Sequence, residues 1–256
     1  MAARMRGGAF VAGVLVVAGL AGCVKQAAPP PPPPPVNPAP SAPANEPEAL
    51  MAALRGLVEQ AGVGDDIRER EIEAGDAYEP CDLLIADPDQ VKGGGLEIDQ
   101  VWGAGLEVNP VSSFTDIQRP TTLLDVTVIG LPDAAAAVAA ARAARTAPCP
   151  REAFRLNIGM ATARWDARTV TIESTSARLT TATVSRVDPE TAGGMTFLPG
   201  DARLIFAHGR LLISIEALTF RPRKLNTAAE VTAMAQGTVT SLATAIVKTL
   251  PTASEG

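Results

Sequence analysis

The sequence predicts an α+β fold: an antiparallel sheet of about six to eight strands with helices packed on one side and a long C-terminal helix. Three observations indicate this fold. Apolar and polar residues alternate in short runs through the second half of the chain, which is typical of half-buried strands. An alanine-rich stretch, residues 134–146, separates two groups of such runs. Thr227-Ala-Ala-Glu230 has the pattern of a capping box, which predicts a last helix extending to about Leu250.

The first half of the chain supplies a helix and several short strands. Leucines at helical spacing predict a helix over Glu48–Ala61. The charged segment 65–76 that follows is interpreted as solvated, and Gly93-Gly94-Gly95 as a loop. Strands are expected at residues 96–101, 105–109 and 123–130.

The second half adds one helix and an antiparallel meander. Asp133 is the expected N-cap of the helix Ala134–Thr146, and Pro148 and Pro150 end it. Strands are expected at residues 154–158, around 170–172, and at 179–187, 203–207 and 210–216. The last two form a hairpin, since Gly209 can adopt the positive φ of a tight turn. His208 beside it is expected to be an exposed turn residue.

Composition excludes several classes of function. The 256 residues include 28 acidic and 22 basic side chains, and 46% are hydrophobic, so a packed core is expected and disorder throughout is excluded. The net charge of −6 and the 4% content of aromatic residues argue against nucleic-acid binding. One histidine and three cysteines leave little material for a metal site. We therefore expect no cofactor, no metal and no catalytic residues.

The N-terminus predicts the location of the protein. Arg4 and Arg6 precede an apolar stretch, Gly7–Gly22, which is too short to span a bilayer and typical of a secretory signal. It ends in Leu20-Ala21-Gly22-Cys23, the lipobox pattern of bacterial lipoproteins. Residues 1–22 are thus predicted to be removed, and Cys23 to carry the lipid that anchors the chain to the extracytoplasmic face of the cell membrane. The alternative is an ordinary signal followed by a chance cysteine.

A proline-rich stalk is expected between the anchor and the folded domain. Residues 23–47 include 11 of the 22 prolines, seven of them consecutive from Pro29 to Pro35. Such a run forms an extended polyproline II spacer, although it can also be a ligand for a partner domain. Residues 48–256 then form a single extracytoplasmic domain.

Two cysteines remain once Cys23 is lipidated. An even pair beyond the membrane favours a disulfide between Cys81 and Cys149. The alternatives are two free thiols or a redox role.

The candidate ligand-binding residues are large side chains. Trp102 and Trp165 are amphipathic enough to line a cleft, and Phe206 lies on another predicted strand. We expect this cleft near the helix Asp133–Thr146. Packing in the core is the alternative role for the tryptophans.

Several stretches resemble a known family, namely TTLLDVTVIGLPDAAAAVAAARAARTAPCP, RLIFAHGRLLISIEAL, AAEVTAMAQGTVTSLATAIVKTL and CDLLIADPDQV. They are similar to the actinobacterial extracellular sensor domain of kinase-H-type membrane serine/threonine kinases, over about residues 78–250. The family typically has more disulfides than this chain can make. The resemblance implies an extracytoplasmic domain with a cleft for an envelope ligand and no known catalysis.

These observations predict a membrane-anchored lipoprotein with a sensor-like, ligand-binding domain. Its partner would be an envelope lipid, a glycan or a protein. A structural or protein-interaction lipoprotein of the cell envelope is the main alternative. A hydrolase that uses a pair of carboxyl groups is a third possibility, because acidic residues are plentiful.

Overall fold

The computed structural model describes residues 46–64, 66–72, 79–81, 83–84, 95–109, 121–148, 154–155, 161–187 and 197–250, which lie in one compact unit. They form three helices and eight strands. In chain order these are α1 (Glu46–Ala61), β1 (Asp66–Glu71), β2 (Trp102–Asn109), β3 (Thr121–Gly130), α2 (Ala134–Thr146), β4 (Phe154–Arg155), β5 (Ala161–Ile172), β6 (Thr175–Val187), β7 (Phe197–His208), β8 (Leu211–Pro222) and α3 (Ala228–Thr249).

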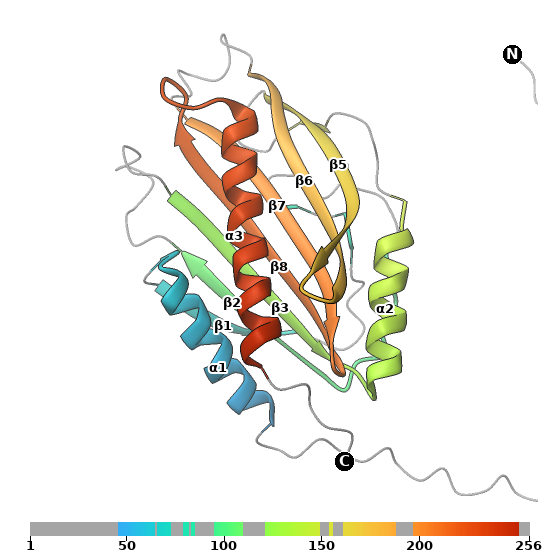
Figure 1. Ribbon diagram of the computed structural model, residues 1–256. Helices are drawn as coiled ribbons and strands as arrows, with labels where there is room; N and C mark the ends of the chain where they lie inside the picture. The colour runs from blue at the N-terminus through green and yellow to red at the C-terminus, as the bar shows by residue number, and fades with distance from the viewer. Residues whose placement is uncertain are drawn as a thin grey trace, which may run out of the picture. The chain divides into compact units, whose positions relative to one another are not determined.

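All eight strands belong to one antiparallel sheet, in the order β1-β2-β3-β8-β7-β6-β5-β4 (Figure 1). Hairpins build most of this sheet, and the pairing of β3 with β8 joins the two halves of the chain. The predicted α+β class, with its antiparallel sheet and long C-terminal helix, is confirmed.

The helices α1 and α3 cover one face of the sheet. Leu54 and Val58 of α1 and Val239 and Ile246 of α3 are fully buried in the main core. From the sheet this core receives alternate residues, including Val128, Leu204 and Ile213. The start of α3 is fixed by the predicted capping box: the Thr227 side chain accepts from the Glu230 N–H, and the Glu230 carboxylate accepts from the Thr227 N–H.

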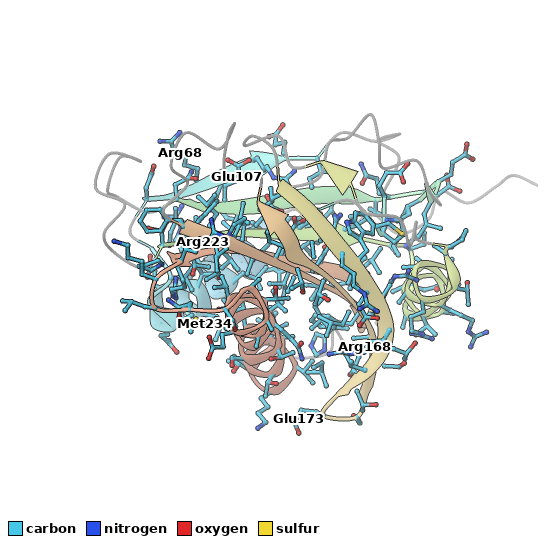
Figure 2. The ribbon with its side chains drawn as sticks, turned by 90° about the horizontal axis from the view of Figure 1, so that it is seen from above. Arg68, Glu107, Arg168, Glu173, Arg223 and Met234 are labelled. Carbon is cyan, nitrogen blue, oxygen red and sulfur yellow. The ribbon has the colours of Figure 1, made fainter. Side chains whose placement is uncertain are left out.

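The third helix, α2, packs against the opposite face, which corrects the expectation that all helices lie on one side. Its buried residues Ala137, Ala141 and Ala144 pack with Ile129, Ile205 and Leu212. These three strand residues directly neighbour Val128, Leu204 and Ile213, so they point away from α3. At this end of the sheet the side chains on both faces are apolar. Each face is therefore buried by a helix, one by α3 and the other by α2. Figure 2 shows α3 and α2 on either side of the curved β5–β6 ribbon.

Two further expectations about strands differ from the structure. The charged segment expected to be solvated contains β1, an edge strand of the sheet. A charged edge strand is favoured because it discourages pairing with other chains. Conversely, residues 96–101 form no continuous strand, and Leu96 alone makes a bridge. Of the strand expected at residues 154–158, β4 covers Phe154–Arg155, and the rest lies outside the described residues.

The β7–β8 hairpin has the predicted turn but a different role for its histidine. Gly209 has φ +56°, as its place in the turn requires. His208, however, is 5% exposed, and its Nε2 lies 2.9 Å from the carbonyl oxygen of Leu250. The expectation of an exposed turn residue is wrong because the C-terminal end of α3 packs against this end of the hairpin.

Candidate functional site

A groove of about 470 Å³ lies between α1 and α3. Its lining residues are Leu57, Gln60, Ala61, Val63, Gly237, Thr238, Ser241, Leu242 and Ala245. Leu57 and Leu242 are buried and form an apolar floor, whereas Gln60 and Ser241 are exposed. None of these described lining residues carries a charge. The volume lies within the range of small-molecule sites.

Small residues of α3 keep the groove open. Gly237, Ser241 and Ala245 recur every four residues, so they share one face of the helix. A Cβ atom added to Gly237 would have nothing within 4 Å, so this position opens onto free space. Met234, one turn earlier, is 40% exposed on α3 (Figure 2). The four-residue spacing of Gly237, Ser241 and Ala245 can be seen in the sequence. It was not recognised there because large aromatic side chains were expected to line the cleft.

The structure does not bring Trp102, Trp165 and Phe206 together. Phe206 is fully buried in the core beneath α1 and α3. Trp165 is 6% exposed and belongs to a separate cluster with Ala182 and Leu218 on the other face of the sheet. Trp102 packs partly buried against the main core. Phe206 and Trp165 thus belong to two separate apolar clusters on opposite faces of the sheet, and Trp102 packs against the first of them.

A second candidate site is a polar network on the face of the sheet opposite α3. Asp125 of β3, Glu216 of β8 and Arg203 of β7 are direct neighbours across the strands. Glu216 is 6% exposed, and Asp201, two residues before Arg203, is fully buried. This face therefore holds two buried carboxyl groups, Asp201 and Glu216.

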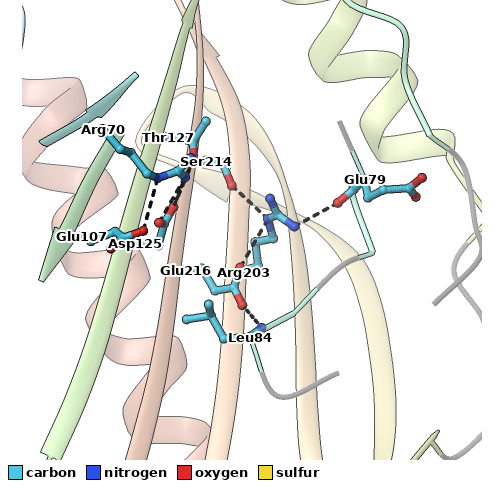
Figure 3. Close-up of polar contacts among 9 residues, drawn as sticks. All are labelled: Arg70, Glu79, Leu84, Glu107, Asp125, Thr127, Arg203, Ser214 and Glu216. Atoms are coloured by element: carbon cyan, nitrogen blue, oxygen red, sulfur yellow. Dashed lines mark hydrogen bonds and ion pairs between the residues drawn. The ribbon is translucent and has the colours of Figure 1, made fainter. Parts of the chain in front are cut away.

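The network also holds the segment 79–84 against the sheet (Figure 3). The Arg203 guanidinium lies 3.7 Å from a Glu216 oxygen and donates to Ser214 Oγ at 3.0 Å and to the Glu79 carbonyl at 2.9 Å. At the other end of the segment, the Leu84 N–H donates to Glu216 Oε1. The Arg203 and Glu216 side chains thus contact the two ends of the segment.

Arg70 completes the network from the edge of the sheet. Its guanidinium donates to Asp125 at 2.9 Å and to Thr127 Oγ1 at 2.8 Å, and it lies 3.8 Å from Glu107. Arg70 therefore pairs with the more exposed carboxylates, Glu107 and Asp125, while Arg203 faces the buried Glu216.

Burial raises the pKa of the Glu216 carboxyl well above its ordinary value, and the Asp201 carboxylate raises this pKa further. The charge of Arg203 and the hydrogen bond from Leu84 oppose this effect without cancelling it. Glu216 is thus a carboxyl group that keeps its proton at unusually high pH. Such a group can act as a general acid, but here its oxygens already face Leu84 and Arg203.

Cys81 lies beside the end of α2. Its sulfur is 3.8 Å from the carbonyl oxygen of Pro148, the residue that precedes Cys149. The Arg178 guanidinium, 3.9 Å from the same sulfur, donates to the carbonyls of Ala144 and Arg145 at 2.7 Å each. Cys149 and Cys23 lie outside the described residues, so the disulfide and the lipid anchor stay predictions.

Within the described ranges, no cluster of three or more His, Cys, Asp or Glu residues could hold a metal ion. The same residues include no helix that is both long and apolar enough to cross a membrane.

Comparisons with known proteins find a distant structural likeness. No protein-family model matches the chain, and neither does any curated protein. The crystal structure of the extracellular domain of PknH from Mycobacterium tuberculosis is similar at a TM-score of 0.39 and 13% sequence identity. The match covers 73% of this chain and 94% of that one. A likeness at this level determines neither the fold nor the function of the chain.

Proposed function

We propose that this protein is a lipid-anchored extracytoplasmic lipoprotein whose sensor-like domain binds a small ligand in the groove between α1 and α3 and catalyses no reaction. The observation that carries the proposal is the groove itself, with its volume of about 470 Å³ and its mixed lining. An apolar floor with a few polar groups at the rim is the usual composition of a small-molecule site.

The lining favours an uncharged ligand with an apolar part. Leu57, Val63 and Leu242 supply apolar surface, and Gln60 and Ser241 supply hydrogen-bonding groups at the rim. An anionic group would find no cation among these residues, and desolvating it there would cost free energy. Of the envelope ligands considered, a neutral lipid therefore fits better than an acidic glycan.

The alternative is a protein-interaction lipoprotein of the cell envelope. One observation favours it: Leu225, in the loop between β8 and α3, is 81% exposed. A large apolar side chain at that exposure is suited to contact with a partner protein.

Filling the groove tests the ligand-binding proposal. Gly237→Leu should place a side chain in the free space beside Ser241, while Gly56→Leu, also at an open position of a helix, lies outside the lining. Detergent-solubilised full-length protein would be screened by thermal shift against neutral lipids, neutral glycans and acidic glycans. We expect neutral lipid to raise the Tm of the wild type and of Gly56→Leu, but not of Gly237→Leu.

Three outcomes would contradict this proposal. Stabilisation that persists in Gly237→Leu would place the site elsewhere. Stabilisation by acidic glycans alone would overturn the assignment of an uncharged ligand. Steady turnover of a compound, abolished by Glu216→Gln, would show that the protein is an enzyme.

A further inference from the structure

The strand β5 has an outer edge that is open over most of its length. In the part of the chain that the structure describes, β4 pairs with β5 at Thr162 and Ala163, and no strand lies against the outer edge after these residues. Residues 166–169 are all exposed, although successive side chains of a strand point to opposite faces. Neither face of β5 is therefore covered there. Such an edge can pair with another chain.

Two opposite charges lie side by side on this edge strand. The Arg168 guanidinium donates to Asp166 at 2.9 Å and to the side chain of Gln236 on α3 at 3.1 Å. Both charged side chains therefore lie on the face of the strand that is turned toward α3. They are still 48% and 58% exposed for Arg168 and Asp166 respectively. Figure 2 shows Arg168 on the curved β5–β6 ribbon.

The order of these charges suits pairing with a second copy of the same strand. Two antiparallel copies of one edge are related by a twofold axis perpendicular to the sheet. If this axis passes beside Ala167, the two small alanines face each other, and Asp166 of each copy faces Arg168 of the other. Opposite charges directly across two strands stabilise their pairing. The strand is thus complementary to itself.

Other positions of the axis fit less well. An axis at Asp166 or at Arg168 would place two like charges opposite each other. An axis at Trp165 would place residue 167 opposite Ala163, whose outer edge is already paired with β4. With the axis at Ala167, residues 164–170 can pair without reaching the part of the edge that β4 occupies.

From this geometry we propose that β5 is a dimer interface. Two copies of the chain join their sheets edge to edge along residues 164–170, with Ala167 at the twofold axis and two reciprocal ion pairs between Asp166 and Arg168.

The other edge strand, β1, has a similar pair of charges but does not suit this pairing. Asp66 and Arg68 are two residues apart and in contact at 2.7 Å, as are Asp166 and Arg168 at 2.9 Å. With an axis at Ile67, however, Glu69 of each copy would face Asp65 of the other, and these like charges repel. On β5 the corresponding positions are uncharged, and β1 therefore offers a matched control.

Sedimentation of detergent-solubilised full-length protein over a concentration series tests the interface. We expect a reversible monomer–dimer equilibrium for the wild type. Asp166→Arg would place arginines opposite each other, and Arg168→Asp would do the same with carboxylates, so each variant alone should dimerise about tenfold or more weakly. The control Asp66→Arg should dimerise as the wild type does.

A mixture of the two β5 variants makes the test specific for the proposed register. In a heterodimer of Asp166→Arg with Arg168→Asp, both opposite-charge pairs are present again, so an equimolar mixture should recover the association. The proposal is overturned if the wild type stays monomeric, if either β5 variant dimerises as the wild type does, or if the mixture fails to associate. Loss of the dimer in Asp66→Arg alone would place the interface on β1 instead. The test involves no ligand, so its outcome is independent of binding in the groove.

Discussion

Gly200 on β7 lies directly beneath the backbone of α3. A Cβ atom at this position would be 2.5 Å from the Thr232 nitrogen and 2.6 Å from the Val231 carbonyl carbon. Both are main-chain atoms in the first turns of a helix whose start is fixed by its capping box, so they cannot easily move. This contact sets how closely α3 approaches the sheet.

We predict that Gly200→Ala destabilises the fold by about 1–3 kcal/mol, because it forces α3 away from β7. Gly237→Ala is the matched control: its methyl group meets nothing within 4 Å, and alanine improves helix propensity by up to about 1 kcal/mol. Urea unfolding followed by circular dichroism measures both. Equal changes in the two variants would contradict the close approach.

At the scale of single residues, local contacts could be predicted and distant ones could not. Asp133 and Thr227 cap helices through atoms three residues away, so their roles follow from short patterns. Glu216 obtains its environment from Asp201, from Asp125 across β3 and from Leu84, 132 residues away. No pattern along the chain relates these positions, and the buried carboxyl pair was therefore missed.

At the scale of elements, the positions of the helices along the chain could be predicted from the sequence, but the face of the sheet on which each helix packs could not. The apolar pairs Val128-Ile129, Leu204-Ile205 and Leu212-Ile213 indicate strands that are buried on both faces. These strands were interpreted as alternating, with a single apolar face. All helices were therefore expected on that face, and α2 was assigned to the wrong face of the sheet. The strand β1 was missed because its charged residues resemble a solvated loop, and Arg70 finds its partner Asp125 two strands away.

The disulfide between Cys81 and Cys149 would join the residues around Cys81 to the end of α2. The position of the Cys81 sulfur, 3.8 Å from the Pro148 carbonyl oxygen, supports this pairing. The bridge would close a loop of 68 sequence steps, 149 minus 81, for which chain entropy gives about 4 kcal/mol. We expect non-reducing peptide mapping to find the linked pair, and Cys81→Ser and the double serine variant to lose similar stability. Alkylation of both thiols in unreduced native protein would disprove the bridge.

At the scale of the whole molecule, the predicted lipid anchor would determine where the domain acts. Cleavage before Cys23 would leave 234 residues, 256 minus 22, with lipid on the new N-terminus. We predict that a palmitate analogue labels the wild type and that the label is absent from Cys23→Ser, which should no longer stay with the membrane. Equal labelling of both proteins would show that the lipobox is a chance sequence.

The central claim is that a ligand occupies the groove between α1 and α3. Native mass spectrometry of protein extracted from its own membrane tests it most directly, with Gly56→Leu and Gly237→Leu prepared in parallel. We predict a non-covalent adduct with the mass of an uncharged lipid on the wild type and on Gly56→Leu, and its loss from Gly237→Leu. An adduct that stays on Gly237→Leu, or wild-type protein without any adduct, would contradict the claim.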